Sequence, residues 1–104
     1  MGPSQPTVLD EATELVDGPR NADYGHPLED FTRIATMWSA LLGVDIEPEQ
    51  VAYCMCCVKL SRQTNKPKRD NLVDLAGYAR TAEMVLDAKT ASAEEVKPIG
   101  DDNE

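Results

Sequence analysis

The sequence predicts an all-α protein, a compact bundle of four main helices followed by a disordered acidic C-terminal tail. Apolar residues recur at helical spacing in four successive segments, and glycine or proline separates these segments. No stretch alternates apolar and polar residues in the way that a half-buried strand does. Residues 90–104 are rich in Ala, Ser, Glu and Asp and contain no aromatic residue, which is typical of disorder.

The first two helices are predicted over residues 8–17 and 27–42. Thr7 is a suitable N-cap for the first helix, and Gly18 followed by Pro19 ends it. Pro27 suits the first position of the second helix, and Gly43 stops it. The expected apolar stripes are Leu9, Ala12, Leu15 and Val16 in the first helix, and Leu28, Phe31, Ile34, Ala35, Trp38, Leu41 and Leu42 in the second.

The other two helices are predicted over residues 48–64 and 70–87, starting at Pro48 and at the N-cap Asp70. Gly77 interrupts the last helix at a cost of about 1 kcal/mol relative to Ala, and close packing of another helix is a reason for it. The expected buried stripes are Val51, Met55, Val58 and Arg62 in the third helix, with Cys54 close to it, and Leu72, Leu75, Ala76, Ala79, Ala82 and Leu86 in the fourth.

Length and charge restrict the organisation and the class of partner. We expect a flexible N-terminus over 1–6, one bundle domain over 7–89 and the tail over 90–104. The net charge of −9 disfavours general DNA binding, and no apolar run is long enough to span a membrane. Because a core of this size is only marginally stable and the apolar stripes are extensive, we expect a homo-oligomer.

Three cysteines lie within four positions, at Cys54, Cys56 and Cys57. Cys54 and Cys57 form a CxxC pair, but two positions on one helix face make a disulfide geometrically awkward, and a zinc site needs about four ligands. We therefore expect reduced, metal-free cysteines that act as small buried apolar residues, which suits a reducing cytoplasm.

A basic cluster followed by two carboxylates is the strongest candidate site. Lys59 and Arg62 end the third helix, and Asp70 and Asp74 share one face at the start of the fourth. Cations beside two carboxylates suit a metal-bound phosphate group, with Arg62 as a bidentate donor and Lys59 as a point charge. The alternative is structural, with Asp70 as a cap and the other charges in salt bridges.

A second candidate segment, Asp-Tyr-Gly-His-Pro, precedes the second helix. Tyr24 offers a ring that stacks on a base, and His26 offers a phosphate ligand or a proton-transfer group. The alternative is a helix-entry loop, with His26 as a weak N-cap. Glu29 and Asp30 follow in the first helical turn, where they suit the helix dipole and are also possible metal ligands.

Three blocks of sequence together resemble a family of small uncharacterised proteins of tailed bacteriophages and prophages. They are YGHPLEDFTRIATMWSALLGVDIEPEQVA, KLSR and DNLVDLAGYA, and the resemblance covers residues 9 to about 86. It implies a protein that works in the cytoplasm of an infected bacterial host and carries little implication for activity.

The block DNLVDLAGYA also resembles part of the metal site of the all-α, MazG-like nucleotide pyrophosphohydrolases. That resemblance implies nucleotide binding and Mg²⁺-dependent cleavage of a nucleoside triphosphate, with Asp70 and Asp74 as catalytic metal ligands and Glu29 or Asp30 completing the site. Asn71 stands where those enzymes have a glutamate. The alternative is a non-catalytic protein that sequesters a nucleotide signal or binds a host protein.

Overall fold

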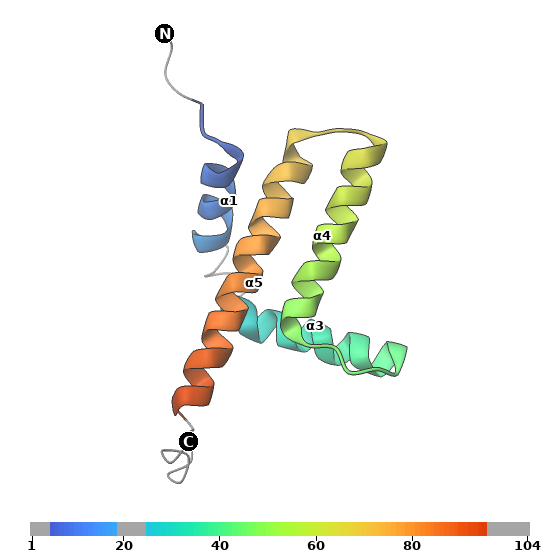
Figure 1. Cartoon of the computed structure of the whole chain (residues 1–104), viewed down its shortest axis with the longest axis vertical. Coiled ribbons are helices and arrows are strands. Elements are labelled where there is room, and N and C mark those ends of the chain that lie inside the picture. Colours follow the sequence, from blue (N-terminus) through green and yellow to red (C-terminus); the bar gives the residue numbers. More distant parts are fainter. Residues whose placement is uncertain (1–4, 19–24, 96–104) are drawn as a thin grey trace, which may run out of the picture.

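The computed structural model describes residues 5–18 and 25–95, and these residues form four helices and no strand. The helices are α1 (Val8–Asp17), α3 (Pro27–Leu42), α4 (Pro48–Asn65) and α5 (Arg69–Glu95) (Figure 1). The predicted all-α class with four main helices is confirmed. Within residues 5–18 and 25–95, no helix is long and apolar enough to cross a membrane.

Local capping explains where α1 begins and where α3 begins and ends. Thr7 and Asp10 form a capping box at the start of α1, with both hydrogen bonds at 3.0 Å. His26 caps α3, because its Nδ1 accepts a hydrogen bond from the backbone N–H of Leu28 at 3.0 Å. Gly43 ends α3 in the left-handed conformation, at φ 73°, which glycine adopts without strain.

Helices α4 and α5 form an antiparallel pair, and α3 crosses them (Figure 1). The ammonium of Lys59 lies 2.9 Å from the carboxylate of Asp74, and the amide of Asn71 donates to Gln63 at 3.0 Å. These contacts fix the register, because residues late in α4 meet residues early in α5.

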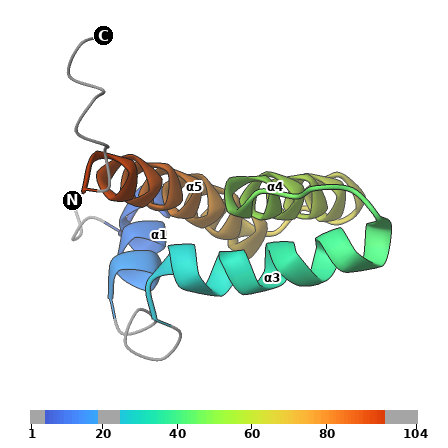
Figure 2. The same ribbon diagram turned by 90° about the horizontal axis from the view of Figure 1, so that it is seen from below.

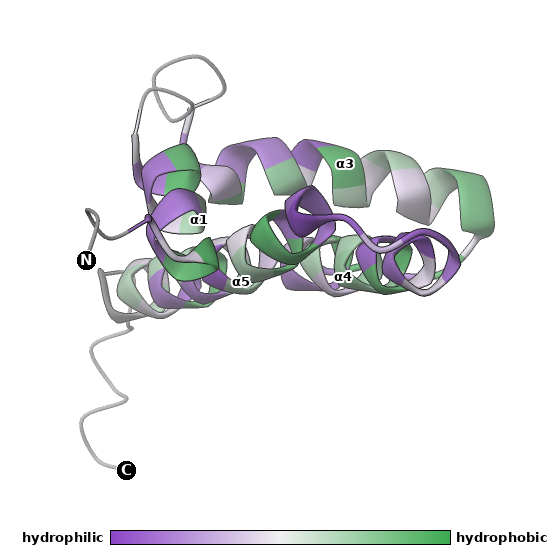
Figure 3. Ribbon diagram, turned by 90° about the horizontal axis from the view of Figure 1, so that it is seen from above, coloured by the Kyte–Doolittle hydropathy of each residue, from purple (hydrophilic) through white to green (hydrophobic). Residues whose placement is uncertain are grey.

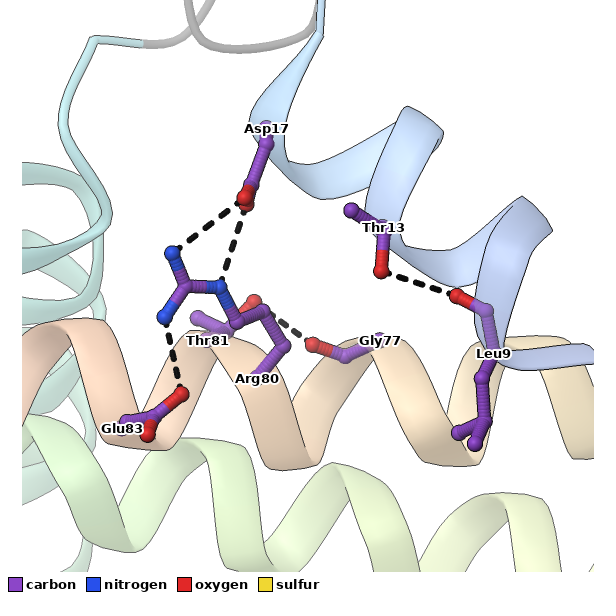
Figure 4. Close-up of polar contacts among 7 residues, drawn as sticks. All are labelled: Leu9, Thr13, Asp17, Gly77, Arg80, Thr81 and Glu83. Carbon is purple, nitrogen blue, oxygen red and sulfur yellow. Dashed lines mark hydrogen bonds and ion pairs between the residues drawn. The ribbon is translucent and has the colours of Figure 1, made fainter.

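Helix α1 runs parallel to α5 and is attached to it at both ends. Arg69 pairs with Glu11 near the start of both helices. Further along, the Arg80 guanidinium donates to Asp17 at 3.2 Å and to Glu83 at 2.8 Å (Figure 4). Hydrogen bonds to Asp17 and then to Glu83 raise the pKa of Arg80, which keeps this attachment charged.

The core is small and consists mainly of small side chains. The buried hydrophobic residues are Ala12, Phe31, Ala35, Val51, Ala52, Val73, Ala82 and Val85. No leucine in the chain is buried, and Leu41 and Leu42 are 82% and 62% exposed. The hydrophobic colouring of α3 continues to its C-terminal end (Figure 3). The predicted stripes of α1 and α3 are therefore only partly buried.

The predicted stripe of α5 is wrong for most of its members. Ala82 is buried as expected, but Leu72 and Leu86 are about two-fifths exposed and Ala79 is exposed. The residues that face the core are instead Asn71, Val73, Gly77, Thr81, Ala82 and Val85. The hydropathy pattern selected the opposite side of the helix, because several core positions carry small or polar side chains.

Two further expectations need correction. Helix α5 continues to Glu95, so residues 90–95 are helical, and the rest of the expected tail lies outside the described residues. Cys54 and Cys57 are exposed rather than buried, and only Cys56 is partly covered. Burial, and then the neighbouring Cys57, raise the pKa of the Cys56 thiol.

Candidate functional site

A cavity of about 140 Å³ lies between α1 and α3, with α5 along its floor. Figure 2 shows α1 and the beginning of α3 together beside α5. The surface that lines the cavity is about half polar, and it includes two carboxylates and a phenol. The lining residues are Ala12, Leu15, Val16, Gly25, Pro27, Asp30, Phe31, Val73, Asp74, Gly77, Tyr78 and Thr81.

Small side chains on α1 and α5 shape this cavity. A Cβ atom added at Gly77 would lie 3.4 Å from Val16 Cγ2, an ordinary van der Waals contact, so α1 packs closely over this position but would leave room for a methyl group. Thr81 is buried, yet its hydroxyl donates to the carbonyl of Gly77 at 2.9 Å (Figure 4). The polar group is therefore satisfied within its own helix, and it does not oppose burial beside the cavity.

The two carboxylates come from different helices, and each is paired with a cation. Asp74 of α5 accepts from Lys59, whose side chain is only 14% exposed. Asp30 of α3 lies 3.4 Å from Arg33 on its own helix. The cavity thus combines two hydrogen-bond acceptors with apolar side chains from α1, α3 and α5.

The other predicted site residues lie elsewhere. Arg62 and Asp70 are exposed and do not line the cavity, and Lys59 reaches it only through Asp74. Glu29 is exposed in the first turn of α3. His26 caps that helix, which agrees with the helix-entry alternative given above for this residue. Tyr24 lies outside the described residues.

The described side chains do not fit the magnesium site that the pyrophosphohydrolase resemblance implies. No three His, Cys, Asp or Glu side chains within residues 5–18 and 25–95 gather closely enough to hold a metal ion. Mg²⁺ prefers near-octahedral oxygen coordination, and each cavity carboxylate already has a cation beside it.

Asn71 gives a physical reason for the departure from those enzymes. Its side chain is buried, and its amide donates to Gln63 and to the carbonyl of Lys66, at 3.0 and 3.5 Å. Asn71 therefore stabilises the α4–α5 turn, and it does not line the cavity.

Sequence reasoning missed Tyr78, Thr81 and Ala12 as cavity residues. Tyr78 stands outside the candidate charge cluster, and the other two carry no chemistry that a motif would reveal. The helical spacing of Asp74, Gly77, Tyr78 and Thr81 was the available signal, because these positions share one side of α5.

Comparison with known proteins assigns the chain to a family. Residues 7–86 match the family model described as Domain of unknown function (DUF6378). The chain belongs to this family. The match covers nearly all the described residues, including α1, the cavity and most of α5.

Two curated relatives are bacteriophage proteins. The chain is 42% identical over 81 residues to the Gene 55 protein of Mycobacterium phage L5, which covers 76% of this chain and 52% of the relative. It is 38% identical over 82 residues to the Gene 55 protein of Mycobacterium phage D29, and this match covers 78% of the present chain and 54% of the relative. The chain thus spans about half the length of these relatives.

These matches confirm the expected resemblance to a phage protein family. No solved structure matches the chain. The family description and the relatives' names assign no activity, so function is argued from the site.

Proposed function

We propose that this phage-family domain is a non-catalytic binding protein that recognises a nucleotide through its base, in the cytoplasm of an infected bacterium. The observation that carries the proposal is the cavity in which apolar side chains stand beside the carboxylates of Asp30 and Asp74. The cavity explains how an acidic domain without a metal cluster in its described residues would bind such a ligand.

The size of the cavity favours a single ring. An apolar cavity of about 150 Å³ is known to hold benzene, and this cavity measures about 140 Å³. Phe31 and Tyr78 supply aromatic surface beside it. A pyrimidine ring, or part of a purine, fits this space, whereas a complete nucleotide extends beyond it.

The charges favour the base over the phosphate inside the cavity. Carboxylates repel phosphate but accept hydrogen bonds from the N–H groups at the edges of bases. The phosphate would then lie outside the cavity. Arg62, one helical turn beyond Lys59 on α4, is an exposed cation that would attract it at long range. In this proposal Asp30 and Asp74 select the base, and Arg62 attracts the phosphate.

Binding without hydrolysis is favoured over the pyrophosphohydrolase alternative. Two-metal and one-metal phosphate chemistry requires carboxylates that converge on an ion. The described residues bring no such group together, and Lys59 occupies one side of Asp74.

Titration with a panel of ligands, followed by NMR of the labelled protein, tests this proposal. We expect nucleoside monophosphates to shift the amide signals of Gly77, Tyr78 and Thr81 with or without Mg²⁺. Ribose 5-phosphate, which has no base, is the matched control and should not shift them. Binding of ribose 5-phosphate as tight as that of the nucleotides, or no nucleotide binding at millimolar concentration, would contradict the proposal.

Asp74→Asn and Asp70→Asn form a matched pair of variants. Both remove one negative charge from the first turns of α5, but only Asp74 lines the cavity. A hydrogen bond to a charged group contributes about 1.5–3 kcal/mol, so Asp74→Asn should weaken binding at least tenfold and Asp70→Asn should not. Equal effects of the two variants would indicate long-range charge rather than contact. Monophosphate release from a triphosphate with Mg²⁺ would support hydrolysis instead.

A further inference from the structure

Helix α1 is the least attached helix of the bundle. Within the part of the chain that the structure describes, it packs against α5 and against no other helix, at one side of the molecule (Figure 2). Ala12 is the only one of its ten residues that is buried, and Leu9 and Leu15 are 69% and 52% exposed. A helix of this length is marginal in water on its own, so α1 depends on its few contacts with α5.

Two arginines of α5 hold the two ends of α1. Arg69 pairs with Glu11 and donates to the carbonyl of Pro6 at 2.7 Å. Arg80 donates to Asp17 at 3.2 Å. All four charged side chains are more than a third exposed, and water and salt screen such ion pairs. These pairs therefore orient α1 on α5 but stabilise the contact only weakly.

The charge of α1 adds nothing to this attachment. Its sequence, VLDEATELVD, contains four carboxylates and no cation. The whole chain has a net charge of −9, so the long-range field of the protein repels α1. Only the two local arginine contacts oppose this repulsion.

The apolar contact between the two ion pairs is shallow. Val16 lies over Gly77, which has no side chain to interlock with α1. Ala12 and Leu15 complete the side of the cavity that α1 forms. Helix α1 can therefore separate from α5 without forcing a large side chain of α5 to move.

The rest of the cavity belongs to the core of the other three helices. Phe31, Val73, Gly77 and Thr81 line it and are buried. Phe31 also shares a core cluster with Ala82 and with residues of α4. Separation of α1 would therefore expose the inner part of the cavity while α3, α4 and α5 remain packed together.

We propose that α1 is a lid on the cavity, which opens as a unit while the other three helices stay folded. A ligand ring would reach Phe31 and Thr81 through this opening, and α1 would then close over it. Local opening of a weakly attached element costs less free energy than global unfolding, and a ligand that contacts the closed state favours closure. The identity of the ligand rests on the proposed function, but the opening of α1 does not.

Thiol labelling at two buried alanines tests the lid without a ligand. Ala12→Cys places a thiol beneath α1, and Ala82→Cys places one in the core of the other helices, at positions that are 3% and 6% exposed. With iodoacetamide and mass spectrometry, the thiol at position 12 should react at least about a hundredfold faster under native conditions. Equal rates would mean that α1 opens only when the whole protein unfolds, which overturns the proposal.

Amide hydrogen exchange of the unmodified protein gives the same comparison without a substitution, so the test does not depend on how either variant folds. Amides of α1 should exchange with one common opening free energy that is lower than that of the amides around Ala82. Equal opening free energies for the two regions would also overturn the lid.

Arg69→Gln and Lys68→Gln form a matched pair of variants within the Ala12→Cys protein. Each removes one cation near the start of α5, but Arg69 contacts α1 and Lys68 is exposed in the preceding turn. Arg69→Gln should accelerate labelling about two- to fivefold, the range for a partly exposed ion pair, and Lys68→Gln should leave it unchanged. Equal labelling rates in the two variants would contradict an arginine that holds the lid closed.

A ligand experiment separates the lid from the proposed function. Where a nucleoside monophosphate shifts the amide signals of Gly77 and Thr81, a concentration of about ten times Kd should slow exchange in α1 about tenfold. Nucleotide binding that leaves exchange in α1 unchanged overturns the lid and leaves the proposed function intact. Absence of nucleotide binding contradicts the proposed function alone, and labelling of Ala12→Cys then decides whether α1 opens.

Discussion

Helix α5 has two sides that differ in both composition and environment. Its front side carries Asp74, Gly77, Thr81 and Val85, faces α1 and α3, and forms the cavity floor and part of the core. Its back side carries Leu72 and Ala79, which are exposed, and Ala76, which is partly buried. The less hydrophobic side is the more buried one, so hydropathy alone does not identify the core of this chain.

The front side is buried because its polar groups find partners. The Thr81 hydroxyl bonds within the helix, and Asn71 bonds to α4 and the turn. No buried side-chain nitrogen or oxygen atom within the described residues lacks a hydrogen-bond partner. Small and satisfied polar residues let neighbouring helices approach closely, which larger leucines on the same side would prevent.

The largest contrast between the two sides should come from introducing a carboxylate on each. Val85→Asp buries an unpaired charge at a fully buried position, so we expect a loss of about 4 kcal/mol or more. Ala79→Asp leaves its carboxylate in water and should cost only about 1 kcal/mol or less, through lost helix propensity. Urea unfolding of the two variants separates these effects.

Destabilisation by Ala79→Asp that is as severe as that by Val85→Asp would show that the back side belongs to the core.

Much of the fold could be predicted because helix boundaries depend on local chemistry. Thr7, Pro27, Gly43 and Pro48 act within one turn of their own positions, and the first three predicted helices agree with the structure to within one residue. The end of α5 was missed because no glycine or proline lies between Asp87 and Glu95, and Ala-rich, Glu-rich sequence continues the helix over these residues.

The candidate site was only partly predictable because it depends on how helices pack. The pairing of Lys59 with Asp74 could be inferred, since a short turn joins their helices. The contribution of Asp30 could not, because α3 reaches the cavity through a crossing that no local pattern encodes. Exposure of Cys57 was missed for a similar reason, because apolar spacing does not reveal which side of a helix its neighbours cover.

A pair of small-residue exchanges should give smaller effects of opposite sign. Ala79→Gly on the back side should cost about 1 kcal/mol through lost helix propensity. Gly77→Ala on the front side should gain less than this, because the new methyl group contacts Val16 at 3.4 Å. Thermal unfolding should therefore rank Gly77→Ala above the unmodified protein and Ala79→Gly below it. A lower transition for Gly77→Ala would mean that α1 packs too tightly to accept a methyl group.

Loss of the Arg80 attachment should affect the front side only. Arg80→Met removes the hydrogen bonds to Asp17 and Glu83, and partly exposed ion pairs contribute about 0.2–1 kcal/mol. Amide hydrogen exchange in α1 should accelerate, and 1 M salt should reduce the difference from the unmodified protein. Lys89→Met is the matched control, since Lys89 pairs with Glu47 and Glu49 at the start of α4. Equal acceleration in α1 by Lys89→Met would mean that Arg80 does not act locally.

The smallest expected effect is a pH dependence at the start of α1. Hydrogen bonds from the Thr7 backbone, and then from its side chain, lower the pKa of Asp10 below its ordinary value of 3.8. Because the pKa of Asp10 is lower in the folded state, the stabilisation from its carboxylate is complete above the unfolded-state pKa. This stabilisation is lost as the pH falls through the folded-state pKa. Backbone amide exchange in α1 should therefore accelerate at acidic pH more in the unmodified protein than in Asp10→Asn, because the asparagine side chain does not titrate. Because α1 covers only the front side of α5, exchange around Leu72 and Ala79 should follow the same pH profile in both proteins. A profile for α1 that Asp10→Asn leaves unchanged would assign the acid sensitivity to another carboxylate.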